Sequence, residues 1–235
     1  MSDNSTLGVD DKRGTRFEVT TVLCVAVLPA LYTSVVYLIS PEIREEDFAY
    51  FANPASQIGF ALYWLSATLL VVYLLWQRGD SFARMGFTFG FATIPLSLAV
   101  CAAAYVAQTG AHILLSGLGG DMFAEELAKT AALFKEQDAR LGLWSLLPIV
   151  VAPLFEETVV RAYLQTRLVA LGWGAASAAL TTALIQAAYH LYQGPDCAVL
   201  AFPLFLVLAL YYARFRGATV VILAHFWWDL MPWIA

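Results

Sequence analysis

Two adjacent glutamates interrupt an otherwise apolar run in the second half of this chain. Glu156 and Glu157 lie within the stretch from Leu141 to Val160, and Arg161 follows directly. Carboxylates at membrane depth are costly to bury and are therefore expected to serve a function. Glu157 and Arg161 are one helical turn apart, so they can pair and offset the cost of burying both charges. Glu156 points about 100° away around the helix. It has no local cationic partner, which suits it to proton transfer.

Two histidines and an aspartate follow in the next apolar stretches. His190 lies near the end of one stretch, and His225 and Asp229 share a helix face in another. The aspartate can orient the imidazole or act beside it. Peptide hydrolysis needs a base, an activated water and an oxyanion stabiliser, and these residue types can supply all three. His112 has no acidic neighbour in sequence and is expected to be structural.

The composition places these polar residues in a membrane protein. Hydrophobic residues make up 60% of the chain and charged residues 13%, and the mean hydropathy is +0.70. Continuous apolar stretches of roughly 20 residues can cross the hydrocarbon as helices, and they lack the alternation of a membrane barrel. We therefore predict an all-α fold, a polytopic transmembrane helical bundle of about seven spans. The predicted spans are residues 17–39, 57–76, 91–115, 141–166, 174–192, 197–213 and 217–234.

The distribution of lysine and arginine predicts the orientation of the bundle. With the N-terminus inside, nine basic residues fall in cytoplasmic segments and four in outer ones, which favours a cytoplasmic N-terminus. The inner set is Lys12, Arg13, Arg16, Arg78, Arg84, Arg161, Arg167, Arg214 and Arg216, and the outer set is Arg44, Lys129, Lys135 and Arg140. The expected organisation is a cytoplasmic tail of residues 1–16 followed by one membrane domain of residues 17–235.

Two connecting segments are longer than turns. Residues 121–139 have apolar residues at helical spacing and charged residues on the other faces, which predicts a helix lying on the outer membrane surface. Such a helix either covers the bundle or gates a substrate path. Residues 40–56 are expected to form a solvated outer loop. Its acidic cluster is Glu42, Glu45, Glu46 and Asp47.

The polar residues form an ordered set of motifs that resembles a known protease family. The segment FEETVVR at 155–161 resembles the Glu-Glu-x-x-x-Arg motif of the CPBP family, the intramembrane proteases named for CAAX processing and bacteriocin processing. The segment AYH at 188–190 resembles the end of the second motif, and AHFWWD at 224–229 resembles the third, His-x-x-x-Asn/Asp. The resemblance covers about residues 150–232 and implies a catalytic core at about 141–232.

The resemblance implies an intramembrane endopeptidase that hydrolyses a peptide bond of a membrane-anchored protein or peptide. Glu156 and His190 would activate the attacking water, while His225 and Asp229 would stabilise the tetrahedral oxyanion. The resemblance also implies a multi-pass protein of a bacterial plasma membrane, with the lipid bilayer and the substrate as partners and no nucleic acid. The supporting residues that hold the helix and the catalytic pair in place would be Glu157 and Arg161.

Three positions depart from the family pattern. Gln186 stands where the second motif usually has Phe, and Ala162 follows the arginine where Gly is frequent. Asp229 occupies a place where asparagine is common. An ionised aspartate cannot donate a hydrogen bond to an oxyanion. If Asp229 acts there, it must be protonated or must orient His225.

Two alternatives use the same residues differently. His190, His225 and a carboxylate could hold Zn²⁺ with an open position for water, although the helical His-Glu-x-x-His arrangement is absent. We favour a glutamic-type protease without metal or cofactor. A protease-like scaffold or a proton-coupled carrier would use the buried residues without cutting. The cysteines have no metal-ligand or redox spacing and are expected to pack in the core. They are Cys24, Cys101 and Cys197.

The depth of His190 conflicts with a fifth span that starts at Gly174. At that start His190 would lie roughly 24 Å from the inner end of its helix, whereas Glu156 lies roughly 22 Å below the outer end of its own. Either the fifth span starts later, with residues 167–178 outside the membrane core, or the helices tilt strongly.

Overall fold

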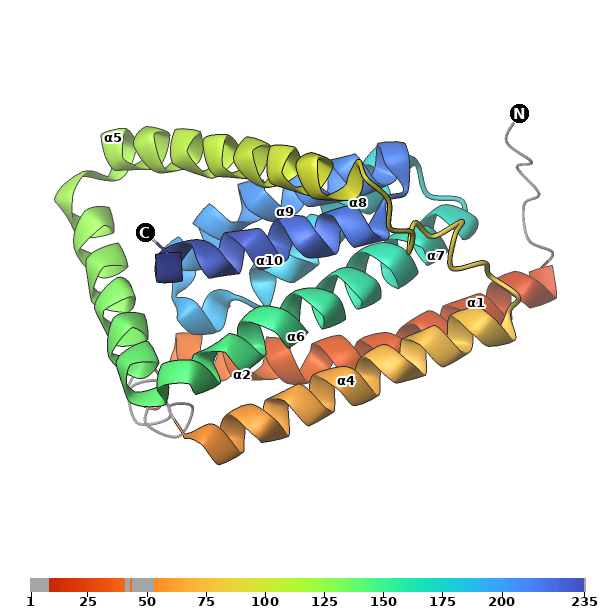
Figure 1. Cartoon of the computed structure of the whole chain (residues 1–235), viewed down its shortest axis with the longest axis horizontal. Coiled ribbons are helices and arrows are strands. Elements are labelled where there is room, and N and C mark those ends of the chain that lie inside the picture. The colour runs from red at the N-terminus through yellow and green to blue at the C-terminus, as the bar shows by residue number, and fades with distance from the viewer. Residues whose placement is uncertain (1–8, 41–42, 44–52, 235) are drawn as a thin grey trace.

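The described part of the chain is entirely helical, as predicted. The computed structural model describes residues 9–40, 43 and 53–234 (Figure 1). The helices are α1 (Val9–Val22), α2 (Leu28–Ile39), α4 (Pro54–Gln77), α5 (Thr93–Leu141), α6 (Leu146–Glu156), α7 (Thr166–Ala170), α8 (Ala175–Ala188), α9 (Pro195–Phe215) and α10 (Ala218–Ile234). Short π- or 3₁₀-helical segments connect them: η1 (Leu23–Val27), η2 (Gly142–Ser145), η3 (Glu157–Gln165) and η4 (Leu191–Gln193).

Five helical segments among the described residues are long and apolar enough to cross a membrane, which identifies an integral membrane protein. They are Asp11–Ile39, Pro54–Gln77, Thr93–Leu118, Gly142–Ala170 and Pro195–Phe215. The last predicted span contains a shorter apolar helix, Ala218–Met231. Helix α8 has 14 residues and rises only about 21 Å. The count of about seven spans is therefore not confirmed by helix length.

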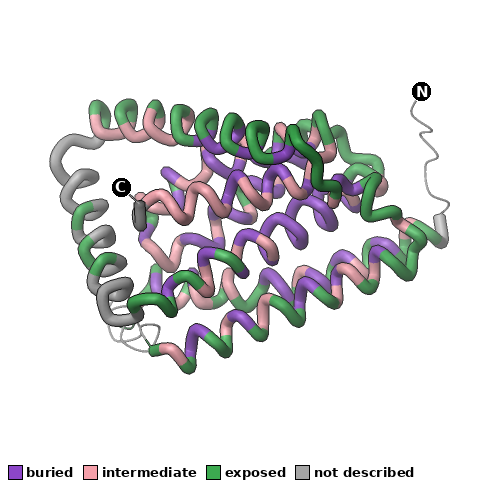
Figure 2. Tube along the Cα trace, in the orientation of Figure 1, coloured by how far each residue is buried: buried purple, intermediate pink, exposed green. Residues whose placement is uncertain are grey.

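Large apolar side chains face outward on the helices at the edge of the bundle. Leu62 and Leu69 on α4 and Val106 on α5 are exposed, whereas burial concentrates in the inner helices (Figure 2). Exposed apolar faces of this kind suit contact with lipid. Cys101 is buried as predicted, but the expectation for Cys24 is wrong, because it lies exposed on η1.

Two apolar cores flank the segment that carries the glutamate motif. One core joins the α1–α2 helical stretch and α4 to Val159, Val160 and Tyr163 of η3. The other joins α5, α8, α9 and α10, and it receives Ala162 from the same segment. In Figure 1 α6 accordingly runs between the α1–α2 and α4 layer and the helices of the C-terminal half. The motif is thus held from both sides.

The connection between α4 and α5 packs against the start of α10. Gly86 has a φ of +83°, and a Cβ at this position would lie 1.7 Å from the backbone oxygen of Arg216. The carbonyl of Gly86 accepts hydrogen bonds from the backbone amide of Thr219 at 3.0 Å and from its hydroxyl at 3.1 Å. Only glycine tolerates both this approach and this backbone conformation. The contact fixes the first turn of the helix that carries His225 and Asp229.

The structure describes only part of the two long connecting segments, residues 40–56 and 121–139. Residues 121–139 belong to the long helix α5, whose C-terminal part turns and runs across the end of the bundle (Figure 1). Most side chains between 119 and 141 lie outside the described residues, so their placement on the membrane surface stays a prediction. The acidic cluster Glu42, Glu45, Glu46 and Asp47 also lies outside the described residues. Helix α1 begins at Val9, within the segment expected to be a tail.

Candidate active site

A nine-residue π-helical segment carries most of the first motif. Glu156 ends α6, and η3 runs from Glu157 to Gln165 with all of its residues buried. Pro153 lies just before this change and lacks an amide proton, so it interrupts the helical hydrogen-bond ladder there. π-Helical turns are rare and are frequently found at functional sites. The sequence suggested an ordinary α-helix at this point.

The Glu157 carboxylate is held by three helical elements. Its Oε2 lies 3.3 Å from Nε of Arg161, and both side chains are 0% exposed, which confirms the predicted ion pair. Its Oε1 accepts from Nδ1 of His225 at 3.0 Å and from the amide nitrogen of Gln186 at 3.0 Å. Glu157 therefore links η3 to α8 and α10.

Glu156 shares the Gln186 amide with its neighbour. Oε2 of Glu156 accepts a hydrogen bond from Nε2 of Gln186 at 2.9 Å. The oxygen of the same amide accepts from Nη2 of Arg161, which also donates to the backbone oxygen of Phe205 at 3.1 Å. Gln186 is fully buried. The sequence marked it only as a departure from the family pattern. Gln186 is a polar residue in an apolar helix, one turn before His190, and this position could have indicated that it belongs to the site.

His190 is oriented by the main chain of α8. Its Nδ1 lies 2.7 Å from the backbone oxygen of Gln186. A carbonyl oxygen can only accept, so Nδ1 carries a proton, and in the neutral ring Nε2 is left as an acceptor. The Phe205 ring packs against both histidines, with its centroid 4.8 Å from that of His190 and 5.6 Å from that of His225. Phe205 thereby spaces the two imidazoles.

His225 lies between two carboxylates. Nδ1 contacts Glu157, and Nε2 lies 3.7 Å from Oδ1 of Asp229, one turn further along α10. The distance to Asp229 is longer than a hydrogen bond. The Asp229 side chain is 29% exposed, against 5% for His225. The structure thus puts both residues on one helix face, as predicted, and leaves Asp229 at the edge of the cluster.

The fold brings all six predicted site residues into one cluster. The Gln186 side-chain amide contacts Glu156, Glu157 and Arg161. His190 contacts the backbone of Gln186, and His225, with Asp229 beside it, joins the cluster through Glu157. Helix α8 begins at Ala175, close to the predicted start of the fifth span, and the depth of His190 in the membrane stays a prediction. His190 connects to Glu156 through the main chain and side chain of Gln186. His112 lies on α5, outside the motif helices.

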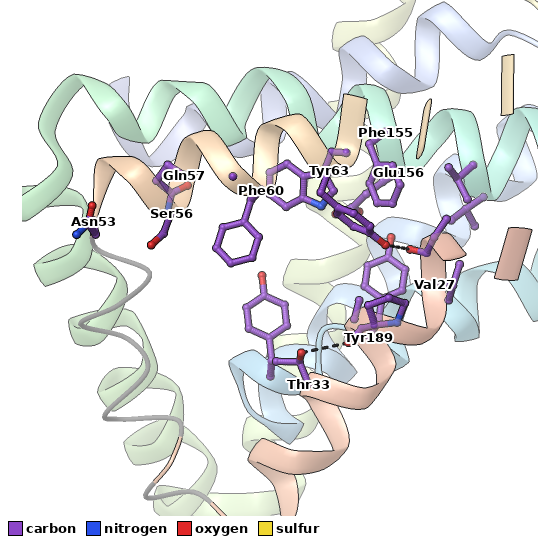
Figure 3. A pocket seen from close by; sticks show the side chains of 18 of the residues that line it. Val27, Thr33, Asn53, Ser56, Gln57, Phe60, Tyr63, Phe155, Glu156 and Tyr189 are labelled. Atoms are coloured by element: carbon purple, nitrogen blue, oxygen red, sulfur yellow. Dashed lines mark hydrogen bonds between the residues drawn. The ribbon is translucent and has the colours of Figure 1, made fainter. Parts of the chain in front are cut away.

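A cavity of about 690 Å³ extends from Glu156 between α2, α4 and the α6–η3 junction (Figure 3). Its walls are mainly apolar and aromatic and include Phe60, Trp64 and Phe155. Figure 3 shows Glu156 and Tyr189 toward one end and Asn53 toward the other. Among the described residues, the other three candidate catalytic side chains do not line this cavity. Glu156 is therefore the candidate that faces it directly.

No group of three or more His, Cys, Asp or Glu side chains in the described ranges has the arrangement of a metal site. The two histidines are close to carboxylates, but His225 engages Glu157 through Nδ1 and His190 engages a carbonyl. Each imidazole is thus held by a hydrogen bond at Nδ1.

Comparison with known families identifies the same region. Residues 138–231 match the family model of type II CAAX prenyl endopeptidase, Rce1-like. The match confirms the resemblance to the CPBP family over this part of the chain. It also implies an intramembrane endopeptidase that acts on a membrane-associated peptide in the bilayer. Comparisons with curated proteins and with solved structures gave no match.

Proposed function

We propose that this protein is a glutamic-type intramembrane endopeptidase in which Glu156 activates the water that attacks the scissile peptide bond. The observation that carries the proposal is the position of Glu156. Its carboxylate is anchored by Gln186 on one side, and the residue lines an apolar cavity on the other. A base at the end of an apolar cavity can meet a peptide that approaches from the membrane.

The first step is the transfer of a proton from water to the Glu156 carboxylate. The water oxygen attacks the carbonyl carbon, and the carbonyl oxygen takes up the negative charge. A positioned general base contributes typically about 10²–10⁴-fold to such a step. Neutral His190, with its Nδ1 proton bound to the Gln186 carbonyl, presents Nε2 as an additional acceptor for the attacking water.

The second requirement is stabilisation of the oxyanion. In the doubly protonated His225 ring both nitrogens donate, so Nδ1 can keep its bond to Glu157 while Nε2 donates to the oxyanion. Asp229 lies beside Nε2 and can join the oxyanion site when it is protonated. Collapse of the intermediate breaks the C–N bond, and the protonated Glu156 returns its proton to the leaving amine.

Glu157 and Arg161 support this chemistry but do not contact the substrate. The Glu157–Arg161 pair fixes η3, and the bond from His225 to Glu157 fixes the imidazole. We further propose a cytoplasmic N-terminus, on the strength of the basic residues in the predicted inner segments.

The proposed substrate is a protein or peptide with a membrane-anchored C-terminal segment. The apolar and aromatic cavity walls fit an apolar chain, and the matched family is described by its prenylated CAAX substrates. A substrate with an unprenylated apolar tail would fit the same cavity walls. Both substrate classes are therefore tested side by side.

The test uses purified protein in proteoliposomes and two fluorescence-quenched peptides. One ends in a farnesylated Cys-aliphatic-aliphatic-X sequence, and the other carries an apolar helical anchor in place of the prenyl group. We expect cleavage of at least one probe at a defined bond, identified by mass spectrometry, and equal rates with and without a metal chelator. No cleavage of either probe by folded protein would contradict the proposal, and loss of activity with the chelator would favour the zinc alternative.

A further inference from the structure

Gln186 uses every hydrogen-bonding group of its amide within the motif cluster. Its Nε2 donates to Oε2 of Glu156 at 2.9 Å and to Oε1 of Glu157 at 3.0 Å, and its oxygen accepts from Arg161. A primary amide has two N–H donors and one carbonyl acceptor. The amide is therefore matched to two carboxylates and one guanidinium.

The backbone of the same residue orients a histidine. The carbonyl oxygen of Gln186 accepts from Nδ1 of His190 at 2.7 Å. One residue thus sets the position of the Glu156 carboxylate with its side chain and the tautomer of His190 with its main chain. The family pattern usually has phenylalanine at this position. Phenylalanine would provide the backbone carbonyl for His190 but no side-chain amide for Glu156.

The two hydrogen bonds also fix the orientation of both carboxyl groups. An N–H group donates to a lone pair, so the Glu156 and Glu157 oxygens that face Gln186 act as acceptors in this arrangement. The amide also separates two adjacent carboxylates that would otherwise repel each other.

We propose that Gln186 is a positioning residue of the active site, which holds the Glu156 carboxylate in the orientation of a general base. The proposal rests on the function proposed above for Glu156. Misplacement of a reacting group by about 1 Å can cost about 10² in rate. The loss of the amide is therefore expected to reduce turnover much more than substrate binding.

Gln165 provides a matched control. It is a second fully buried glutamine that bridges helices, donating to the backbone oxygen of Ala209 at 3.0 Å and accepting from Thr182 at 3.3 Å. Its bonds in the described part of the chain involve none of the six motif residues. Gln165→Met removes the same groups as Gln186→Met at a comparable burial.

The kinetic test compares kcat and KM of the two variants on the cleaved probe in proteoliposomes. Gln186→Met should lower kcat about 10-fold or more with KM within about twofold, because the amide acts on the base and not on the cavity wall. Gln165→Met should leave kcat within about threefold of wild type even where its thermal midpoint falls equally. Equal kcat values for the two variants, or a loss confined to KM, would overturn the proposal.

A substrate-independent test uses an apolar carbodiimide, which reacts with carboxyl groups in membranes and reaches Glu156 more readily once its hydrogen bond to Gln186 is lost. Labelling of Glu156, quantified by peptide mass spectrometry, should be several-fold faster in Gln186→Met than in wild type and unchanged in Gln165→Met. Glu156→Gln gives the background. If Gln186→Met does not fold, Gln186→Asn keeps a polar group but withdraws it by one methylene, and the same increase is expected. An unchanged labelling rate in the folded variant overturns the proposal.

The two proposals fail in different ways. Full activity of Glu156→Gln would reject the proposed function itself. An inactive Glu156→Gln together with wild-type kcat and labelling in Gln186→Met would reject the role of Gln186 alone.

Discussion

Arg161 is a cation with no exposed surface in the middle of the motif. It pairs with Glu157 through Nε and donates through Nη2 to Gln186 and to the backbone of Phe205. The Glu157 carboxylate and these two oxygens therefore offset its charge. Removal of one partner of a buried ion pair leaves the other charge without compensation.

We expect Arg161→Ala to destabilise the protein by about 3–5 kcal/mol, because it removes the cation that pairs with the buried Glu157 carboxylate. Glu156→Gln keeps the side-chain volume and can still accept from Gln186, so its effect on stability should be small. Thermal unfolding in detergent, with folded yield as a second measure, compares the two. Equal midpoints for these variants would contradict the supporting role of the pair.

Asp229 is the residue at which protonation matters most for the proposed oxyanion site. Asp229→Asn should keep or raise activity and flatten its pH dependence, because an amide donates to the oxyanion without needing a proton. The pH–rate profiles of both proteins on one probe give the answer. Loss of activity across the whole pH range in a folded variant would reject the oxyanion role and favour a metal ligand or an orienter of His225.

Tyr189 carries a buried hydroxyl near the Glu156 carboxylate that meets no partner at full hydrogen-bond geometry among the described residues. Tyr63 lines the same cavity, but its hydroxyl donates to the backbone oxygen of Val25 at 2.6 Å. Tyr189→Phe should therefore be neutral or stabilising, whereas Tyr63→Phe should cost about 1 kcal/mol. Thermal midpoints of the two variants test the difference. A larger loss for Tyr189→Phe would show that its hydroxyl is bonded in the folded protein.

At the scale of elements, the site depends on how α10 is anchored. Gly86 provides that anchor through its positive φ, its close approach to Arg216 and its two bonds to Thr219. Gly86→Ala should cost at least about 1–2 kcal/mol, because an L side chain is strained there even before the clash is counted. Gly59 in α4 has open space around its Cβ position. Gly59→Ala should therefore be neutral or stabilising, and a similar midpoint for both variants would argue against the anchor.

The sequence predicted the contacts that lie within one helix and missed those between helices. Glu157 with Arg161 and His225 with Asp229 follow from helical spacing alone, and the structure places both pairs together. The bond from His225 to Glu157 depends on how α10 packs against η3, which no local pattern encodes. The same is true of Gln186, whose side-chain partners come from the end of α6 and from η3.

Element lengths were predicted less well than element type. Apolar composition made the helices evident, but α8 ends at Ala188, where the chain turns. Gly194 then caps α9, which begins at Pro195. The predicted span of residues 174–192 continued through this turn. The π-helical form of η3 was also missed, since its residues read as an ordinary apolar helix with two charges.

At the scale of the whole molecule, the motif segment lies between two apolar cores and beside one cavity. The α1–α2 and α4 layer contributes cavity walls and packs on one side of η3. On the other side, α8 brings Gln186, the turn after α8 brings His190, and α10 brings His225. The cavity wall that can receive an apolar substrate is thereby separated from the polar cluster that holds the proposed base, Glu156. Glu156 is where the two meet.

The most direct test of the account is the cleavage rate of Glu156→Gln in proteoliposomes, measured with the same probe and the same amount of folded protein as wild type. We expect turnover to fall by a factor of about 10² or more, because the amide cannot take the proton from water. Its thermal midpoint should stay close to that of wild type. Cleavage at a rate near that of wild type would contradict the assignment of Glu156 as the base.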